Sequence, residues 1–546
     1  MVCNFHSRIS QLLSDDGCGA ASVLWPPAGH IPAIVAPRSN PNLSCKHAAF
    51  GFRLQLWRTF RSKVSASNKQ LPELQNTKPA TDRENIPTEE MGDEGFDFGW
   101  LPAFPHALIA SMSNFLFGYH IGVMNGPIVS IARELGFEGN PLIEGFVVSI
   151  FIAGAFLGSI VSGSLCDRLG FRRTFQIDTI PLILGTIICA QAQSVDEILW
   201  GRFLVGLGIG VNTVLVPVYI SEVAPTKYRG SVGTLSQIGT CLGMMTALFL
   251  DIVSDNDPHG WRMLLNIASV PGLILAVGIQ FSVDSPRWLC KAGRVNDSRA
   301  IIRNLWGSYD VDKVIDEFQS VIKNDAGMES RWSELLQEPH RRAAFIGSAL
   351  FILQQFAGIN GVLYFSSLTF KDAGIQSGSL ASLLTGITNL AGALFALYLI
   401  DKQGRRKLLI GSYLGMAVSM FVVAFSLTSS MDQQFSNSLA VVGTVSYVFS
   451  FALGSGPVTG LVIPEMSSNR TRGKIMGFSL SVHWVCNFVV SLLFLEVVKE
   501  VGVAAVYGSF GGVSVMSAVF VYYYIVDTRG RSLEEIEKSL APPPAK

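Results

Sequence analysis

Long apolar runs separated by short polar loops occupy the chain from residue 104 to residue 526. A helix needs about 20 predominantly apolar residues to cross the hydrocarbon core of a bilayer. Only helices and closed barrels satisfy every backbone polar group inside lipid. The pattern therefore predicts an all-α membrane protein with twelve transmembrane helices, at residues 104–124, 143–164, 174–194, 198–220, 231–252, 263–283, 343–366, 380–400, 408–428, 439–463, 474–496 and 503–526.

One long polar segment, residues 284–342, divides the twelve predicted spans into six plus six. We expect a first six-helix bundle over residues 104–283 and a second over residues 343–526, followed by a tail at 527–546. Helical stretches at 295–305, 311–323 and 332–336 inside the polar segment predict a small amphipathic helical linker. Gly residues are frequent within the spans, which suits close packing of helices in lipid.

The composition excludes several other classes of protein. Of the 546 residues, 49% are hydrophobic and only 15% are charged, against about 25% in a typical soluble domain. Lys plus Arg and Asp plus Glu number 41 each, so the chain lacks the basic surface of a nucleic-acid binder. The eight Cys are scattered without metal-ligand spacing, and we expect neither a metal site nor a cofactor.

The N-terminal region differs from the rest of the chain. Residues 1–72 hold eight Lys and Arg and nine Ser but only two acids, Asp15 and Asp16. An acid-poor, Ser-rich and Arg-bearing start is typical of an organelle transit peptide, and a disordered cytosolic tail is the alternative. Residues 73–103 carry acids such as Glu84 and Glu89 and predict a solvated linker.

The basic residues of the loops predict the orientation in the membrane. The loops after the second, fourth, eighth and tenth spans hold twelve Lys and Arg, whereas the opposite loops with their edges hold five. The positive-inside rule then places both termini and the 284–342 segment on the inner face. If the leader is a plastid address, that face is the stroma.

The same loops reveal an internal repeat. Asp167-Arg168-Leu-Gly170 after the second span recurs as Asp401-Lys402-Gln-Gly404 after the eighth span, 234 positions later. A second signal joins Glu222 to Tyr228-Arg229-Gly230, and it recurs from Glu465 to Thr471-Arg472-Gly473. Duplicated six-helix halves are the architecture of transporters that rock two bundles around a site at the midplane.

Several motifs carry a resemblance to a known family. They are Gly201-Arg202-Phe203, Pro217-Val-Tyr-Ile-Ser-Glu222, Asp284-Ser-Pro286-Arg287-Trp288, Gln354-Gln355-Phe-Ala-Gly358-Ile-Asn360 and Thr528-Arg-Gly530-Arg531. Over residues 98–540 the chain resembles a sugar porter of the major facilitator superfamily. Within that family, Phe117-Gly118-Tyr119-His120 and Ser481-Val-His483-Trp484 look most like the plastidic glucose transporters. The resemblance implies two pseudo-symmetric six-helix bundles, a transporter rather than an enzyme, and no cofactor.

The resemblance also implies which residues bind sugar. A hexose has many hydroxyls and no charge, so amides that both donate and accept, with an aromatic face, suit it. On an unbroken helix Gln354 and Asn360 would point about 120° apart, and unwinding at Gly358 and Gly361 would bring them together. The implied substrate-binding residues are Gln237, Gln354, Gln355, Asn360, Asn389, Trp484 and Asn487.

The sequence departs from the family pattern at pocket positions. Gly460 stands where many relatives carry a Trp that stacks on the sugar, and Ala452 stands where they carry an acid. His483 stands where relatives often carry Asn. These departures predict a smaller and less aromatic pocket wall, which either admits a bulkier sugar or binds glucose more loosely.

His120 raises the question of energy coupling. Proton-coupled relatives carry an Asp at this position, and facilitative relatives carry an Asn. Burial favours the neutral imidazole, which behaves as an amide-like donor and acceptor, so we favour facilitated diffusion. The alternative is that His120 carries a proton.

Charged residues of the repeated loops predict a gate on the inner face. Acids and bases at fixed positions can hold the two bundles together and separate when that face opens. The candidate gating residues are Asp167, Arg168, Glu222, Arg229, Lys402, Arg406, Glu465 and Arg472.

The sequence therefore predicts a sugar transporter that moves glucose or a similar hexose across the plastid inner envelope by alternating access. The alternatives are a proton–sugar symporter, a non-transporting sugar receptor on the same scaffold and a polytopic membrane enzyme. We expect a monomer to suffice, because both halves lie in one chain. The preferred sugar, the direction of flux and the cleavage site of the leader stay open.

Overall fold

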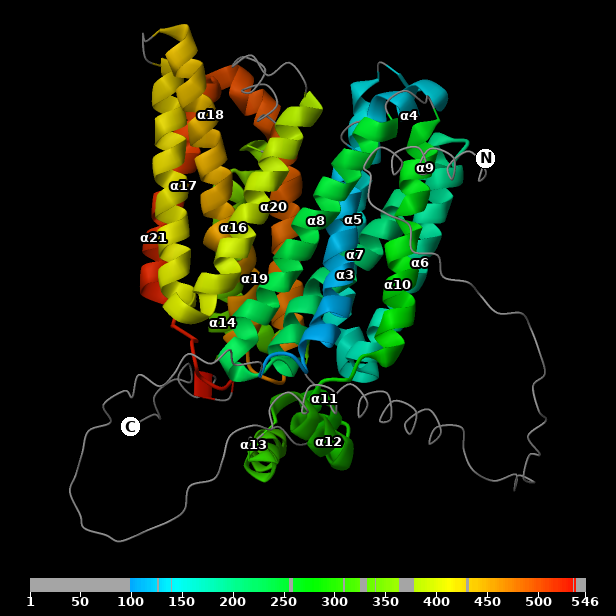
Figure 1. The fold of residues 1–546 in the computed structure, drawn as a ribbon, viewed down its shortest axis with the longest axis vertical. Coiled ribbons are helices and arrows are strands. Elements are labelled where there is room, and N and C mark those ends of the chain that lie inside the picture. The colour runs from blue at the N-terminus through cyan, green and yellow to red at the C-terminus, as the bar shows by residue number, and fades with distance from the viewer. Residues whose placement is uncertain are drawn as a thin grey trace, which may run out of the picture. The chain divides into compact units, whose positions relative to one another are not determined.

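A computed structural model gives the fold of the chain (Figure 1). The leader 1–72 and the linker up to residue 98 lie outside the described residues. Every regular element within the described residues is a helix. The structure describes residues 99–124, 127–138, 140–254, 259–307, 310–324, 331–338, 340–362, 378–428, 432–533 and 535–536.

The first six predicted spans are confirmed as helices. The sixth span consists of two consecutive helices that meet at Ala268. A short helix, α4 (Ile128–Glu134), follows the first span. The spans are α3 (Phe104–Gly122), α5 (Pro141–Leu169), α6 (Phe171–Gln191), α7 (Val195–Val223), α8 (Arg229–Ser254), and α9 (Gly260–Ile267) with α10 (Ser269–Gly278).

The second six predicted spans are also helical. In the tenth span a π-helical turn, η5 (Phe451–Ser455), separates α18 from α19. Such turns are rare and often lie at functional sites. The helices are α14 (His340–Phe356), α16 (Gly378–Gln403), α17 (Arg405–Thr428), α18 (Gln433–Ser450), α19 (Gly456–Glu465), α20 (Arg472–Val501) and α21 (Val503–Tyr524).

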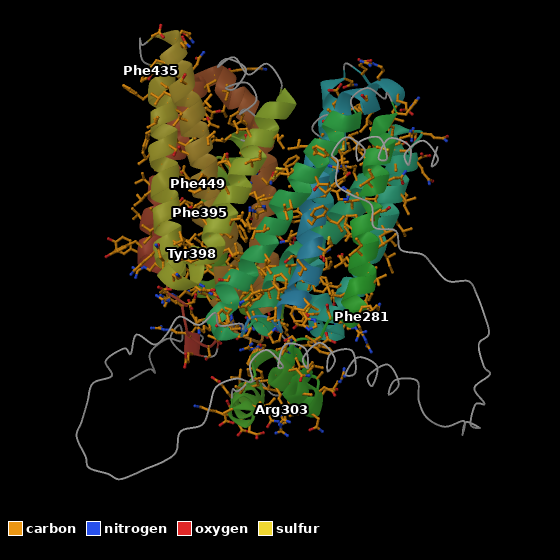
Figure 2. All side chains as sticks on the ribbon, in the orientation of Figure 1. Phe281, Arg303, Phe395, Tyr398, Phe435 and Phe449 are labelled. Atoms are coloured by element: carbon orange, nitrogen blue, oxygen red, sulfur yellow. The ribbon has the colours of Figure 1, made fainter. Side chains whose placement is uncertain are left out.

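The surfaces of these helices suit a bilayer. Among the described residues, ten spans are long and apolar enough to cross a membrane. The two remaining spans, α3 and α20, carry polar side chains, such as His120 in the last turn of α3 and His483 within α20. Large apolar side chains point outward from the helices, and Phe281 and Phe395 are 63% and 57% exposed (Figure 2). Exposed apolar area of this extent marks a contact with lipid.

The two halves contact each other mainly through two helix pairs, α5 with α20 and α8 with α16. These pairs join the second span to the eleventh and the fifth to the eighth. Gly163 of α5 and Gly473 of α20 pack backbone to backbone, and a Cβ at Gly163 would lie 2.6 Å from the Gly473 carbonyl. Residues as small as Gly are required where two helix backbones approach each other this closely.

The segment between the halves contains the short helices α11 (Pro286–Lys291), α12 (Val295–Trp306) and α13 (Val311–Asn324), with the 3₁₀ turn η4 (Trp332–Leu336). Its apolar core includes Ile302 and Phe318. The Trp306 indole donates to the Val223 carbonyl at 2.9 Å, which fixes this segment to the end of α7. The face of the two bundles on which the segment lies is here named the linker face.

Candidate functional site

A cavity of about 460 Å³ lies between the two halves. This volume is in the range of small-molecule sites, about 300 to 1,000 Å³. The cavity brings together all ten residues that the sequence predicts for the pocket, from helices of both halves. They are His120, Gln237, Gln354, Gln355, Asn360, Asn389, Gly460, His483, Trp484 and Asn487.

The seventh span is broken at Gly358, one of the two glycines at which unwinding would bring Gln354 and Asn360 together. α14 ends at Phe356, Gly358 has a left-handed φ of +94°, and helical turns resume at Ile359. Gly is favoured at such a φ because it has no Cβ. The Ala357 carbonyl freed by the break accepts a hydrogen bond from the Tyr447 hydroxyl at 2.8 Å.

The break places Asn360 against Gln355. Asn360 Nδ2 donates to Gln355 Oε1 at 2.7 Å, although an unbroken helix would separate the two residues around its circumference. Gln355 Nε2 lies 3.0 Å from His483 Nδ1 on α20. Three polar side chains from two helices thus form a continuous chain at the cavity wall.

Gln354 contacts the π-helical turn instead of Asn360. Its Nε2 donates to the Ser455 carbonyl at 2.6 Å. The Ser412 hydroxyl of α17 donates to the Ser450 carbonyl at 2.7 Å and accepts from the Ser455 N–H at 2.8 Å. The backbone groups that the π turn removes from the helical ladder therefore find side-chain partners.

Trp484 is 2% exposed and forms an apolar wall of the cavity. Its ring makes edge contacts with Phe117 and Phe151 of the first half, with centroids 5.8 and 6.4 Å away. Its indole N–H donates to the Ser159 hydroxyl of α5 at 3.0 Å. The predicted pocket aromatic therefore also joins the two halves.

The remaining predicted pocket residues differ in their surroundings. Gln237 Nε2 contacts Cys241 Sγ at 3.7 Å, and Asn389 Oδ1 is buried without a described hydrogen-bond partner. A Cβ on Gly460 would meet nothing within 4 Å, so this wall of the cavity is open. Ala452 lies outside the lining, in the π turn, and packs against Gly392.

His120 lines the cavity and is 1% exposed. Within the described residues, neither of its ring nitrogens has a hydrogen-bond partner. Its carbonyl accepts from Arg202 Nη1 at 3.4 Å. Arg202, which the sequence analysis does not assign to the pocket, also lines the cavity and lies over the Phe151 ring at 5.0 Å.

The described lining residues include no carboxylate. Across the described part of the chain, no group of three or more His, Cys, Asp or Glu is arranged to hold a metal ion. The polar groups of the wall are amides, two imidazoles, one guanidinium and the hydroxyls of Thr213, Ser236 and Thr240, and the rest of the wall is apolar. Such a wall suits an uncharged ligand with many hydroxyls, because amides both donate and accept.

At the linker face one buried ion pair joins the halves. Arg472 Nη1 of α20 donates to Glu222 Oε1 of α7 at 2.7 Å, and the side chains are 2% and 6% exposed. Arg472 also donates to the Pro464 carbonyl at 2.9 Å, and Glu222 accepts from the Ser285 hydroxyl. This contact links two of the predicted gating residues directly.

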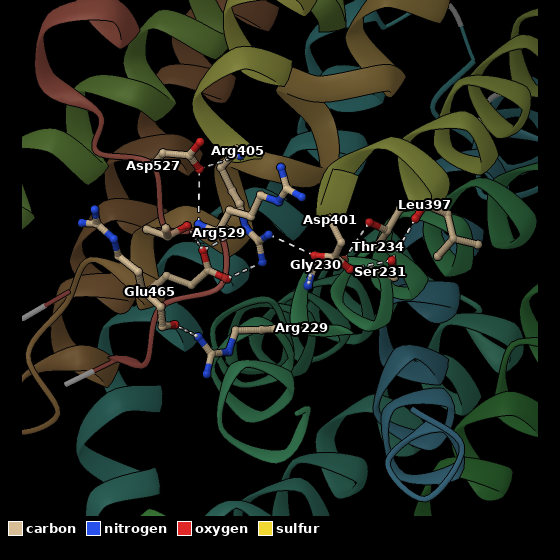
Figure 3. A network of polar contacts seen from close by, with 12 residues as sticks. Arg229, Gly230, Ser231, Thr234, Leu397, Asp401, Arg405, Glu465, Asp527 and Arg529 are labelled. Carbon is tan, nitrogen blue, oxygen red and sulfur yellow. Dashed lines mark hydrogen bonds and ion pairs between the residues drawn. The ribbon is translucent and has the colours of Figure 1, made fainter. Parts of the chain in front are cut away.

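A second contact between the halves involves Asp401, which the prediction of the gate omits. Its carboxylate accepts from the N–H groups of Gly230 and Ser231 at 3.1 and 2.7 Å, in the first turn of α8 (Figure 3). A carboxylate is stabilised at a helix N-terminus by unpaired N–H groups and the helix dipole. Arg229 in the same turn donates to the Arg531 carbonyl at 3.4 Å.

Glu465 pairs within the second half. It accepts from Arg405 at 2.9 and 3.2 Å and from the Thr528 hydroxyl at 2.5 Å. Arg405 also contacts Asp401 at 3.0 Å, so it joins the two acids (Figure 3). The predicted gate includes the neighbouring residues Lys402 and Arg406 but not Arg405.

The other predicted gating residues make no described contact across the halves. Lys402 bonds the Tyr398 hydroxyl at 2.5 Å, and Arg406 contacts the carbonyl and ring of Tyr522. Asp167 pairs with Lys291 of the linker segment at 3.2 Å, and Arg168 is exposed. In this conformation the closed linker face is held by Glu222, Arg472, Asp401 and Arg229.

Two six-helix halves that share a polar cavity and close on each other at one face define a membrane transporter of the alternating-access type. Residues 106–540 match the family model described as "Sugar (and other) transporter". The chain therefore belongs to this family of sugar transporters.

Named relatives agree with this assignment. "Probable plastidic glucose transporter 1" of Arabidopsis thaliana is 65% identical over 486 residues, which cover 88% of this chain and 92% of that protein. "Plastidic glucose transporter 4" of the same plant is 42% identical over 436 residues, 80% of each chain. A structure of the proton:xylose symporter XylE bound to 6-bromo-6-deoxy-D-glucose shares the fold, with a TM-score of 0.74 at 24% identity over 81% of this chain and 100% of that chain.

Proposed function

We propose that the chain moves glucose or a similar hexose across the plastid inner envelope by facilitated diffusion. The observation that carries the proposal is the set of amides Gln354, Gln355 and Asn360, which the broken α14 presents to a cavity shared by the two halves. Asn389, Asn487 and Gln237 add further polar groups to the same cavity. Trp484 supplies an apolar surface for the sugar ring.

The location rests on the leader and on the relatives. Residues 1–72 have the composition of a transit peptide, and the relatives above are named as plastidic. Residues 73–103 are then the linker that precedes the mature bundles 104–283 and 343–526. The positive-inside rule places the termini and the 284–342 segment in the stroma. We infer that one chain suffices for transport, since both halves of the cavity belong to it, and that the chain is not an enzyme.

The absence of a carboxylate among the described lining residues favours a uniporter. A proton carrier must titrate during each transport cycle, and only His120 and His483 among the lining residues have a reference pKa close to neutral. A neutral imidazole serves as a hydrogen-bonding group without carrying a proton. A proton–sugar symporter is the alternative that the experiment separates.

The gate consists of the contacts that close the linker face. Glu222 with Arg472, and Asp401 with the first turn of α8, stabilise the state in which that face is closed. Breaking them would open the cavity toward the linker face. The two contacts then shift the equilibrium between the states with a closed and an open linker face toward the closed state.

Exchange of labelled glucose in proteoliposomes that hold the full chain tests the proposal. We expect exchange by the wild type and at least tenfold weaker glucose affinity in the double variant Gln355→Ala, Asn360→Ala, because several hydrogen bonds to sugar are lost. Gln434→Ala is the matched control, since it removes an exposed amide of α18 that does not line the cavity. Wild-type affinity in the double variant would contradict the proposed site.

A further inference from the structure

Asn360, Gln355 and His483 form a hydrogen-bonded chain with a defined direction. Asn360 Nδ2 donates to Gln355 Oε1 at 2.7 Å, and Gln355 Nε2 lies 3.0 Å from His483 Nδ1. All three residues line the cavity, at the break in α14 and on the facing side of α20. The chain therefore connects two positions at which a ligand can bind.

The direction follows from the chemistry of the groups. An amide NH₂ can only donate, so His483 Nδ1 must accept from Gln355. The proton of the neutral imidazole then resides on Nε2, which becomes a donor. At the other end Asn360 uses one of its two Nδ2 hydrogens on Gln355, and its Oδ1 is left as an acceptor. The two ends of the chain therefore differ: His483 Nε2 can only donate to a ligand, whereas Asn360 Oδ1 can only accept from one.

The imidazole is fixed by its neighbours. Its ring lies edge-on to Phe351 of α14 and to Trp484, with both centroids 5.0 Å away. Trp484 is itself held by its bond to Ser159 of the first half. His483 Nδ1 is thus a positioned acceptor rather than a mobile one, and Gln355 has a fixed partner.

We propose that His483 is a specificity-determining positioning residue, which fixes the orientation of Gln355 and through it that of Asn360. A sugar hydroxyl at Asn360 Oδ1 must then donate, and a hydroxyl at His483 Nε2 must accept. Without the ring nitrogen, the Gln355 amide can rotate by 180°, Asn360 can follow, and the two ends of the chain become interchangeable. This inference rests on the proposed function, because it concerns how that site discriminates between sugars.

Deoxy and fluoro analogues of glucose distinguish the two roles of a hydroxyl. A fluorine cannot donate a hydrogen bond, whereas a hydrogen neither donates nor accepts. For a hydroxyl that donates to Asn360, the fluoro and deoxy analogues should both bind about tenfold more weakly than glucose. For a hydroxyl that accepts from His483, the fluoro analogue should retain more of the affinity than the deoxy analogue.

The test is inhibition of labelled glucose exchange by the complete set of analogues, with the full chain in proteoliposomes. His483→Phe keeps a ring but removes both nitrogens, and we expect the differences between analogues to shrink to within about threefold. His483→Asn places an accepting amide oxygen near the position of Nδ1, and it should retain the wild-type ranking. Cys486→Ala on the same helix, outside the cavity lining, is the control.

Two results would overturn the inference. One is that His483→Phe weakens the binding of every analogue by the same factor and keeps their ranking, which would indicate that His483 serves only in packing. The other is that His483→Asn loses the ranking as His483→Phe does. If His483→Phe does not fold, His483→Leu makes the same comparison. Absence of any glucose exchange by the wild type would instead contradict the proposed function itself.

A measurement independent of transport tests the same geometry. Nitrogen NMR of the full chain with labelled histidine separates the two neutral tautomers, and the signal absent from His483→Phe identifies His483. We expect the proton on Nε2 and a non-protonated Nδ1. A proton on Nδ1 would reverse the direction of the chain and contradict the assignment.

Discussion

Replacing Glu222 by Gln should shift the chain toward the state in which the linker face is open. Glu222 Oε1 accepts from Arg472 Nη1 at 2.7 Å, and both side chains are almost wholly buried. The pair is the described ionic contact that joins α7 of the first half to α20 of the second. An amide at residue 222 keeps the shape of the side chain but removes its charge.

The size of this shift depends on which hydrogen bonds Glu222 and Arg472 keep when the linker face opens. Arg472 retains the carbonyls of Pro464 and Ser467, and Glu222 retains the Ser285 hydroxyl. The effect is therefore smaller than the roughly 3–5 kcal/mol that follows when a buried charge loses every partner. Exchanging a charged hydrogen bond of about 1.5–3 kcal/mol for a neutral one of about 0.5–1.5 kcal/mol loses roughly 1–1.5 kcal/mol. Such a loss corresponds to about a tenfold shift in the equilibrium.

Distance measurements between two spin labels on the linker face would check this shift. Arg173 and Lys407 are exposed in the first turns of α6 and α17, one in each half, and suit the labels. The population with the short distance should fall about tenfold relative to the open one in Glu222→Gln. An unchanged distribution, or a shift toward the short distance, would refute the reasoning. Glu338→Gln is the control, because Glu338 pairs with Arg341 at the surface.

Three further predictions concern other parts of the molecule. Gly460→Trp should tighten hexose binding about three- to tenfold, because the indole stacks on the sugar ring, and it should exclude a disaccharide. Inhibition of labelled glucose exchange measures both effects, and unchanged inhibition by maltose would contradict the prediction. Gly358→Ala should lower the melting temperature, since a Cβ would lie 2.2 Å from Phe510 at a φ that costs an L-residue about 1–2 kcal/mol; an unchanged melting curve would contradict it. Burial raises the pKa of Glu134, but hydrogen bonds from Arg262, Trp261 and His259 outweigh this effect and hold the pKa below its usual range. Glu134 therefore stabilises α4 at neutral pH, and this stabilisation is lost as the pH falls through the lowered pKa. At neutral pH, α4 should take up deuterium faster in Glu134→Gln than in the wild type, and the difference should disappear on acidification. A difference that persists at low pH would exclude this role.

The sequence alone predicts the helices well because lipid imposes a strong constraint. A run of about 20 apolar residues has few alternatives to a spanning helix. The break in the seventh span was also predictable, since Gly358 and Gly361 bracket Asn360 in a helix that carries amides. The π turn in the tenth span was not, because Phe451–Ser455 has no composition that distinguishes it from an α-helix.

The residues that line the cavity could be predicted from type and family pattern, but their partners could not. Gln355 contacts His483 across 128 positions of the chain, and Trp484 contacts Ser159 across 325. The gate illustrates the limit of loop patterns. Arg405 rather than Lys402 or Arg406 joins Glu465 and Asp401, because successive residues of a helix point about 100° apart and α17 begins at Arg405 itself.

Counterflow of labelled glucose in proteoliposomes that hold the full chain, with and without an imposed pH gradient, separates facilitated diffusion from proton coupling. We expect exchange of glucose that does not respond to the gradient, with His120 as a neutral hydrogen-bonding group. Uphill accumulation driven by the gradient would contradict facilitated diffusion and make His120 and His483 the first candidates for proton carriers. Absence of glucose exchange in a folded protein would contradict the assignment of the cavity to a hexose.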